Sequence, residues 1–191
     1  MKNPLALAFA AAFVLVPVAA ARAHITPPVR LASEREAVTR LLTGATRYFV
    51  REVRLTPAQR QTIRRRTGWS PDDDYYRLYV GRTADRAAVA FAVFLTDFTI
   101  HGPVRVAVAL APSGKVKSAA VVEISEETYQ WVKPLLEAGF LEGFAGADAG
   151  SAASKTAGAG NSMERFYARV IAGLVARAAV LYEVAAGARG P

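Results

Sequence analysis

The sequence predicts an α+β fold, in which a meander of antiparallel strands is flanked by N-terminal helices and a long C-terminal helix. Two observations carry this prediction. Between residues 75 and 124, apolar side chains recur with a period of two in four segments that short turns separate. From residue 163 to 185, apolar side chains recur with the period of an α-helix. Strands joined by short turns pair as antiparallel neighbours, and a helix packed on one face would complete a single domain.

Residues 1–23 have the pattern of a signal peptide. Lys2 provides a positive start, Leu5 to Val18 is almost wholly apolar, and Ala21-Arg22-Ala23 has the small residues of a cleavage site. Cleavage after Ala23 would leave residues 24–191 as one domain in the periplasm or outside the cell. A retained segment would instead tether the domain to a membrane. The chain contains 0 Cys, which excludes disulfides and thiolate metal sites.

Two helices are expected before the sheet, so that residues 24–72 form a helical part and residues 73–191 hold the sheet and the last helix. Ser33-Glu34-Arg35-Glu36 has the pattern of a capping box, and apolar residues continue at helical spacing as far as Phe49. Thr56-Pro57-Ala58-Gln59 repeats the pattern, with proline at the first helical position.

Four strands are expected after the acidic loop Asp72-Asp73-Asp74, whose carboxylates lack the spacing of a calcium loop and suit a turn. The strands are expected over residues 75–80, 88–100, 104–110 and 116–124. A short helix is expected from Glu126 to Ala138. An Ala/Gly/Ser-rich connector over residues 145–160 then leads to the final helix.

The formal net charge is +8 at pH 7, and arginines concentrate in the first half of the chain. They are Arg47, Arg51, Arg54, Arg60, Arg64, Arg65 and Arg66. No aromatic platform accompanies them, and an exported protein does not meet nucleic acid, so nucleic acid is not expected as a partner. The arginines are expected to form a solvated surface or to dock an acidic redox partner or anionic lipid headgroups.

The supply of catalytic side chains is poor. His24 and His101 are the two histidines, and neither a Gly-x-Ser-x-Gly nor a His-Glu-x-x-His pattern occurs. We therefore assign no catalytic residue, and we expect a structural role for His101 in a strand turn. One alternative is a copper site that uses the mature N-terminal amine and imidazole of His24 together with His101.

The candidate binding feature is the loop directly before the final helix. Its small residues place backbone N–H groups at a helix N-terminus, where the unpaired amides and the helix dipole favour an anion such as phosphate. The residues of this loop assigned to binding are Thr156, Gly158, Ala159, Gly160, Asn161 and Ser162.

The order of motifs resembles the FMN-binding domain of exported flavoproteins. That family includes the flavin-carrying subunits of the Rnf and sodium-translocating NADH:quinone oxidoreductase complexes. The resemblance rests on the hairpin from Gly102 to Glu126, which ends in acidic residues, on Phe140-Leu141-x-Gly143-Phe144-x-Gly146 and on Ala157-Gly158-Ala159-Gly160-Asn161-Ser162. It implies an exported electron-transfer protein that holds FMN between the sheet and the final helix and receives electrons from a redox partner protein, in the membrane or outside it.

The family pattern also implies how the flavin is held. The loop should read Ser-Gly-Ala-Thr-x-Ser/Thr, with its Thr bound to FMN through a phosphoester, and the acidic segment that contains Glu126 and Thr128 should meet the flavin. Here Gly160 stands at the position of the acceptor Thr, and glycine has no hydroxyl. Three outcomes stay open: noncovalent FMN, attachment displaced to Thr156 or Ser162, or a flavin-free interaction or scaffold module of the same fold.

Overall fold

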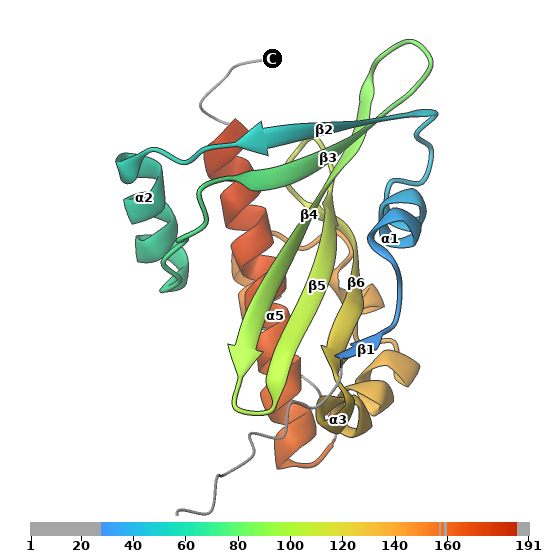
Figure 1. Ribbon diagram of the computed structural model, residues 1–191, viewed down its shortest axis with the longest axis vertical. Coiled ribbons are helices and arrows are strands. Elements are labelled where there is room, and N and C mark those ends of the chain that lie inside the picture. The colour runs from blue at the N-terminus through green and yellow to red at the C-terminus, as the bar shows by residue number, and fades with distance from the viewer. Residues whose placement is uncertain (1–27, 157, 159, 187–191) are drawn as a thin grey trace, which may run out of the picture.

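The computed structural model describes residues 28–156, 158 and 160–186, which form a six-stranded antiparallel sheet and surrounding helices (Figure 1). The strand order is β1-β6-β5-β4-β3-β2. The strands are β1 (Pro28–Arg30), β2 (Arg47–Val53), β3 (Tyr76–Arg82), β4 (Ala88–Thr99), β5 (Gly102–Leu110) and β6 (Val116–Ser125). Strands β3 to β6 are neighbours in chain order, which confirms the predicted meander and the α+β class.

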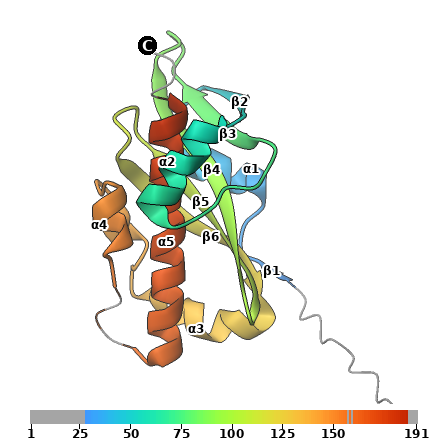
Figure 2. The ribbon, with the colours of Figure 1, turned by 90° about the vertical axis from the view of Figure 1, so that its left-hand side faces the viewer.

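The helices cover both faces of this sheet. They are α1 (Glu34–Leu41), α2 (Pro57–Thr67), α3 (Glu126–Glu137), the 3-10 helix η1 (Glu142–Phe144), α4 (Ala149–Ala153) and α5 (Ser162–Ala186). Figure 2 shows α5 running along one face of the sheet, with α2 and α4 packed against it and α1 on the opposite face. No helix among the described residues is long and apolar enough to cross a bilayer.

Both predicted capping boxes form. The Ser33 hydroxyl accepts from the Glu36 N–H, and the Glu36 carboxylate accepts from the Ser33 N–H. Thr56 and Gln59 make the equivalent pair at the start of α2. These bonds satisfy amides that have no partner inside their helices, and so they fix where α1 and α2 begin.

The predicted extension of the first helix to Phe49 is wrong, because the chain turns after Leu41 and forms β2. Gly44, at φ 93°, adopts a left-handed turn conformation that favours glycine. The following Tyr48, Phe49 and Val50 are aromatic or β-branched and pair with β3, Phe49 lying opposite Val80. Residues 24–72 are therefore not a purely helical part: among those described, β1 and β2 contribute the two edges of the sheet.

The Ala/Gly/Ser-rich connector contains structure that the sequence analysis does not predict. Asp148 caps the short helix α4 by accepting from the Ser151 N–H at 2.8 Å. Before it, the Gly146 N–H donates to the carbonyl of Val116, whose own N–H donates to Ala147. The first part of the connector is thus fastened to the start of β6.

The two faces of the sheet carry cores of different size. The main core lies between the sheet and α5, where side chains such as Val106 and Val108 of β5 pack with Ile171 and Leu174. On the other face, Ala107 and Ala109 meet α1, and these small side chains allow the helix to approach closely. Because successive side chains of β5 point to opposite faces of the sheet, this one strand contributes to both cores.

Candidate functional site

The N-terminus of α5, where the sequence predicts a bound phosphate, is capped by its own side chains. Asn161 Oδ1 accepts from the N–H groups of Met163 and Glu164, each at 2.9 Å. The Glu164 carboxylate accepts from the Asn161 N–H at 3.2 Å and from its side-chain amide at 2.9 Å. The amides of residues 161, 163 and 164 are therefore already paired, and a carboxylate that would repel phosphate lies beside them.

The other residues of the predicted loop lie at the surface. Thr156, Gly158, Gly160 and Ser162 are exposed, and Ser162 is the first residue of α5, whereas Ala159 lies outside the described residues. Gly160 has a φ of 128°, and a side chain there would clash with the Glu164 carboxylate. An acceptor hydroxyl at this position would thus require both a strained backbone and a displaced Glu164.

Thr128, the second part of the predicted site, is fully buried. The Ser125 hydroxyl donates to Thr128 Oγ1 at 2.7 Å, and Thr128 Oγ1 donates to the Tyr167 hydroxyl at 3.1 Å. The neighbouring Glu126 is exposed at the first turn of α3. The hydroxyl expected to meet a flavin carbonyl is therefore engaged inside the protein.

Although these groups are paired, the structure brings both parts of the predicted site to one end of the molecule. Helix α3 lies beside the N-terminal end of α5 (Figure 2), and Thr128 bonds to Tyr167 in the second turn of α5. The Tyr167 ring stacks on Trp131 at 5.7 Å between centroids and an interplanar angle of 10°. The space between the two helices is thus filled by aromatic side chains.

His101, in the turn between β4 and β5, belongs to the same cluster. Its Nδ1 lies 2.9 Å from the Glu127 carboxylate, and its ring lies 5.0 Å from that of Trp131. Among the described residues, no group of three or more His, Asp or Glu side chains could hold a metal ion. His24, on which the copper alternative depends, lies outside those residues.

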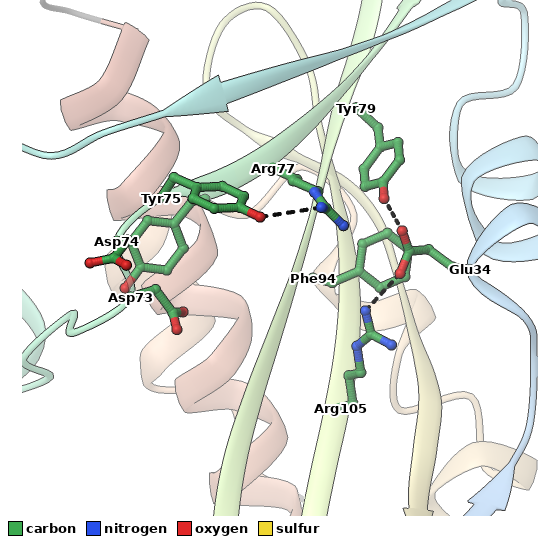
Figure 3. A pocket seen from close by; sticks show the side chains of 9 residues that line it. Glu34, Asp73, Asp74, Tyr75, Arg77, Tyr79, Phe94 and Arg105 are labelled. Carbon is green, nitrogen blue, oxygen red and sulfur yellow. Dashed lines mark hydrogen bonds and ion pairs between the residues drawn. The ribbon is translucent and has the colours of Figure 1, made fainter.

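A cleft of about 430 Å³ on the α1 side of the sheet is a feature that the sequence analysis misses (Figure 3). Glu34, at the start of α1, accepts from the Tyr79 hydroxyl and from the Arg105 guanidinium, the latter at 2.8 Å. Arg105 also lies over the Phe94 ring, 5.0 Å from its centroid. These residues come from α1, β3, β4 and β5, so no local motif contains them. Their mutual pairing clamps α1 onto the sheet.

The far end of this cleft holds a second polar group. Arg77 donates to the Tyr75 hydroxyl at 3.2 Å, and the side chains of Asp73 and Asp74 line the same cleft (Figure 3). This loop is held to α2 by Arg60, which donates to the Asp73 carbonyl at 2.7 Å. The carboxylates therefore lie in a fixed turn, as the sequence predicts, and the cleft offers charged and hydrogen-bonding groups.

Tyr76, which also lines the cleft, has a buried hydroxyl without a hydrogen-bond partner among the described residues. Burial, reinforced by the charge of Asp73, raises the pKa of Tyr76 to about 12 from 10.0. The folded state disfavours the phenolate. The part of the unfolding free energy that is linked to the ionisation of Tyr76 is therefore fully present below pH 10.0 and is lost as the pH rises toward about 12.

We expect Tyr76→Phe to raise the unfolding free energy by about 1 kcal/mol at neutral pH, since it removes an unpaired buried hydroxyl. Its advantage over the wild type should grow by about 1.4 kcal/mol near pH 11, because only the wild type loses the stability that is linked to the ionisation of Tyr76. Urea unfolding of both proteins at neutral and alkaline pH measures the two terms. An equal pH dependence for both would show that Tyr76 ionises freely in the folded protein.

Comparison of this chain with protein-family models, with curated proteins and with solved structures gives no match. The resemblance to FMN-binding domains therefore stays a prediction from the motifs.

Proposed function

We propose that this protein is an exported interaction module that has the fold expected of an FMN-binding domain and carries no flavin. The observation that carries the proposal is the start of α5, where the side chains of Asn161 and Glu164 pair the amides of residues 161, 163 and 164 and place a carboxylate beside the predicted phosphate loop. Gly160, at the expected attachment position, offers no hydroxyl for a phosphoester. With these amides paired and without an acceptor hydroxyl at position 160, the function that we propose is the binding of a partner by the surface of the domain.

The interior of the predicted site supports the same proposal. A flavin ring that reached the Thr128 hydroxyl would have to displace the Trp131–Tyr167 stack and break the bond from Thr128 to Tyr167. Those side chains form a closed, packed end of the domain in which the hydroxyls of Thr128 and Tyr167 satisfy each other.

Noncovalent FMN binding, with electron transfer from a redox partner, is the second candidate. It is favoured by the placement of Thr128 and the start of α5 at the same end of the molecule. Bound flavin would supply one- and two-electron chemistry. Binding would require the Glu164 carboxylate to leave the Asn161 N–H, so that the amide could meet the phosphate.

An absorption spectrum separates these candidates. The protein is exported in the presence of a flavin transferase, scanned from about 350 to 500 nm, and scanned again after acid precipitation. We expect a colourless protein that takes up no added FMN. Flavin bands that remain with the acid pellet would overturn the proposal in favour of attachment at Thr156 or Ser162. Bands released to the supernatant would establish noncovalent FMN.

The Glu164→Gln variant sharpens this test because it removes the charge while keeping hydrogen-bond acceptors at the start of α5. If the start of α5 is a phosphate site held closed by Glu164, this variant should bind added FMN more tightly than the wild type. The exposed Glu137→Gln in α3 is the matched control for the loss of one negative charge. We expect neither variant to quench FMN fluorescence.

A further inference from the structure

Strand β2 is an edge strand with an unusually apolar, exposed surface. Among the described residues it pairs with β3 alone, so one row of its backbone N–H and C=O groups has no partner strand. Three consecutive side chains, Tyr48, Phe49 and Val50, are 45%, 50% and 57% exposed. Natural sheets protect edges of this kind with charges or cover them with another segment.

The charges along this edge are mainly positive. Arg51 lies opposite Leu78 of the main core, which places Arg47, Phe49 and Arg51 on the α5 side of the strand. Arg54 follows directly after the strand. Within residues 28–156, 158 and 160–186, none of these three arginines lies within salt-bridge distance of a carboxylate.

The undescribed parts of this chain cannot supply the missing negative side chains. Residues 1–27, 157, 159 and 187–191 contain no Asp or Glu. A second copy is also a poor occupant, because the strand carries Arg47 and Arg51 against the single acid Glu52 and would repel itself. Charge complementarity therefore favours an occupant of this edge that carries carboxylates.

We propose that β2 is a docking edge for an acidic segment of a partner protein, which adds to the sheet as a seventh, extended strand. Main-chain hydrogen bonds to the free edge would provide affinity. Carboxylates on alternate residues would lie on the α5 side with Arg47 and Arg51, while the apolar residues between them would cover Tyr48 and Val50 on the other side. This inference goes beyond the flavin question and stands whether or not the protein binds FMN.

Two N-methylated peptides test the proposal with the intact protein. The probe is a synthetic peptide of about nine residues that alternates Glu with Val, and each isomer carries N-methyl groups on one of the two sets of amides. Alternate amides of an added strand point toward β2. We expect one isomer to bind and the other to bind at least about tenfold more weakly, with amide NMR shifts concentrated on residues 47–53.

A charge-reversal variant of the protein provides a second test. Arg51→Glu should weaken binding of the competent isomer at least about tenfold, because it sets like charges opposite one another. Arg169→Glu is the matched control. Arg51 lines the same pocket as Ala185, near the C-terminal end of α5, and residue 169 lies about 24 Å from residue 185 along that helix. This control should leave binding unchanged within about twofold.

Three results would overturn the proposal. Equal binding of both isomers would indicate charge attraction without strand addition, as for an anionic polymer or membrane surface. If neither isomer binds at about 1 mM, β2 is not a docking edge for an acidic strand. Concentration-dependent dimers in sedimentation, abolished by Arg51→Glu, would identify a second copy as the occupant.

Discussion

The Tyr167→Ala variant is expected to lose about 3–5 kcal/mol of unfolding free energy, the largest effect predicted for this protein. Tyr167 is fully buried, stacks on Trp131 and meets Phe166 edge to face at 5.1 Å between ring centroids. Removal of the ring would leave a large cavity where α3, α5 and the β4–β5 turn meet. Because small domains have only about 5–15 kcal/mol of stability, the variant should lose between about a fifth and all of it.

The Tyr167→Phe variant separates packing from hydrogen bonding. It keeps the ring and removes the hydroxyl that accepts from Thr128 at 3.1 Å, so it should lose only about 1 kcal/mol. Urea unfolding of both variants, with the slope m unchanged, gives the two losses from the shift in midpoint. Similar small losses for Ala and Phe would contradict the packed arrangement of this end of the molecule.

These values also bear on the flavin question. A ligand that uses the Thr128 hydroxyl must first break its bond to Tyr167, and a ring inserted between α3 and α5 must open the stack with Trp131. The stability lost in Tyr167→Phe therefore measures part of what such a ligand would have to supply. A strongly stabilised network favours the flavin-free proposal.

Gly102→Ala is expected to be the second most damaging substitution, with a loss of about 2–4 kcal/mol. Gly102 begins β5 with a φ of 105°, which strains any other residue. An added Cβ would also lie 2.9 Å from the Cβ of Ser125 and 3.2 Å from its hydroxyl oxygen. Ser125 would have to move, and its 2.7 Å bond to Thr128 would be lost with it.

Gly68→Ala is the matched control for this substitution. Gly68 ends α2 with a φ of 69°, and no atom lies within 4 Å of an added Cβ. It should therefore lose only the cost of the left-handed backbone, about 1 kcal/mol. Thermal and urea unfolding of both variants measure the difference. Equal losses would show that Ser125 yields without cost to the buried network.

The elements that the sequence predicts correctly are those that local chemistry determines. The capping pairs Ser33–Glu36 and Thr56–Gln59 lie within four residues, and the strands of the meander are joined by short turns. The error at residues 42–49 has the same origin. A few apolar residues match both periods over so short a stretch, and only pairing with β3 decides that residues 47–53 are a strand.

The features of the candidate site can likewise be divided into those that the sequence determines and those that depend on the tertiary structure. The sequence alone determines that position 160 has no hydroxyl, that the undescribed ends have no acidic side chain and that arginines concentrate near β2. Only the tertiary structure decides that Thr128 turns inward to Tyr167, that Glu34 joins Arg105 and Tyr79, and that β2 lies at an edge. The physical reason is that burial and charge pairing depend on which distant segments the fold brings together, whereas caps, turns and missing functional groups depend on residues within a few positions of one another.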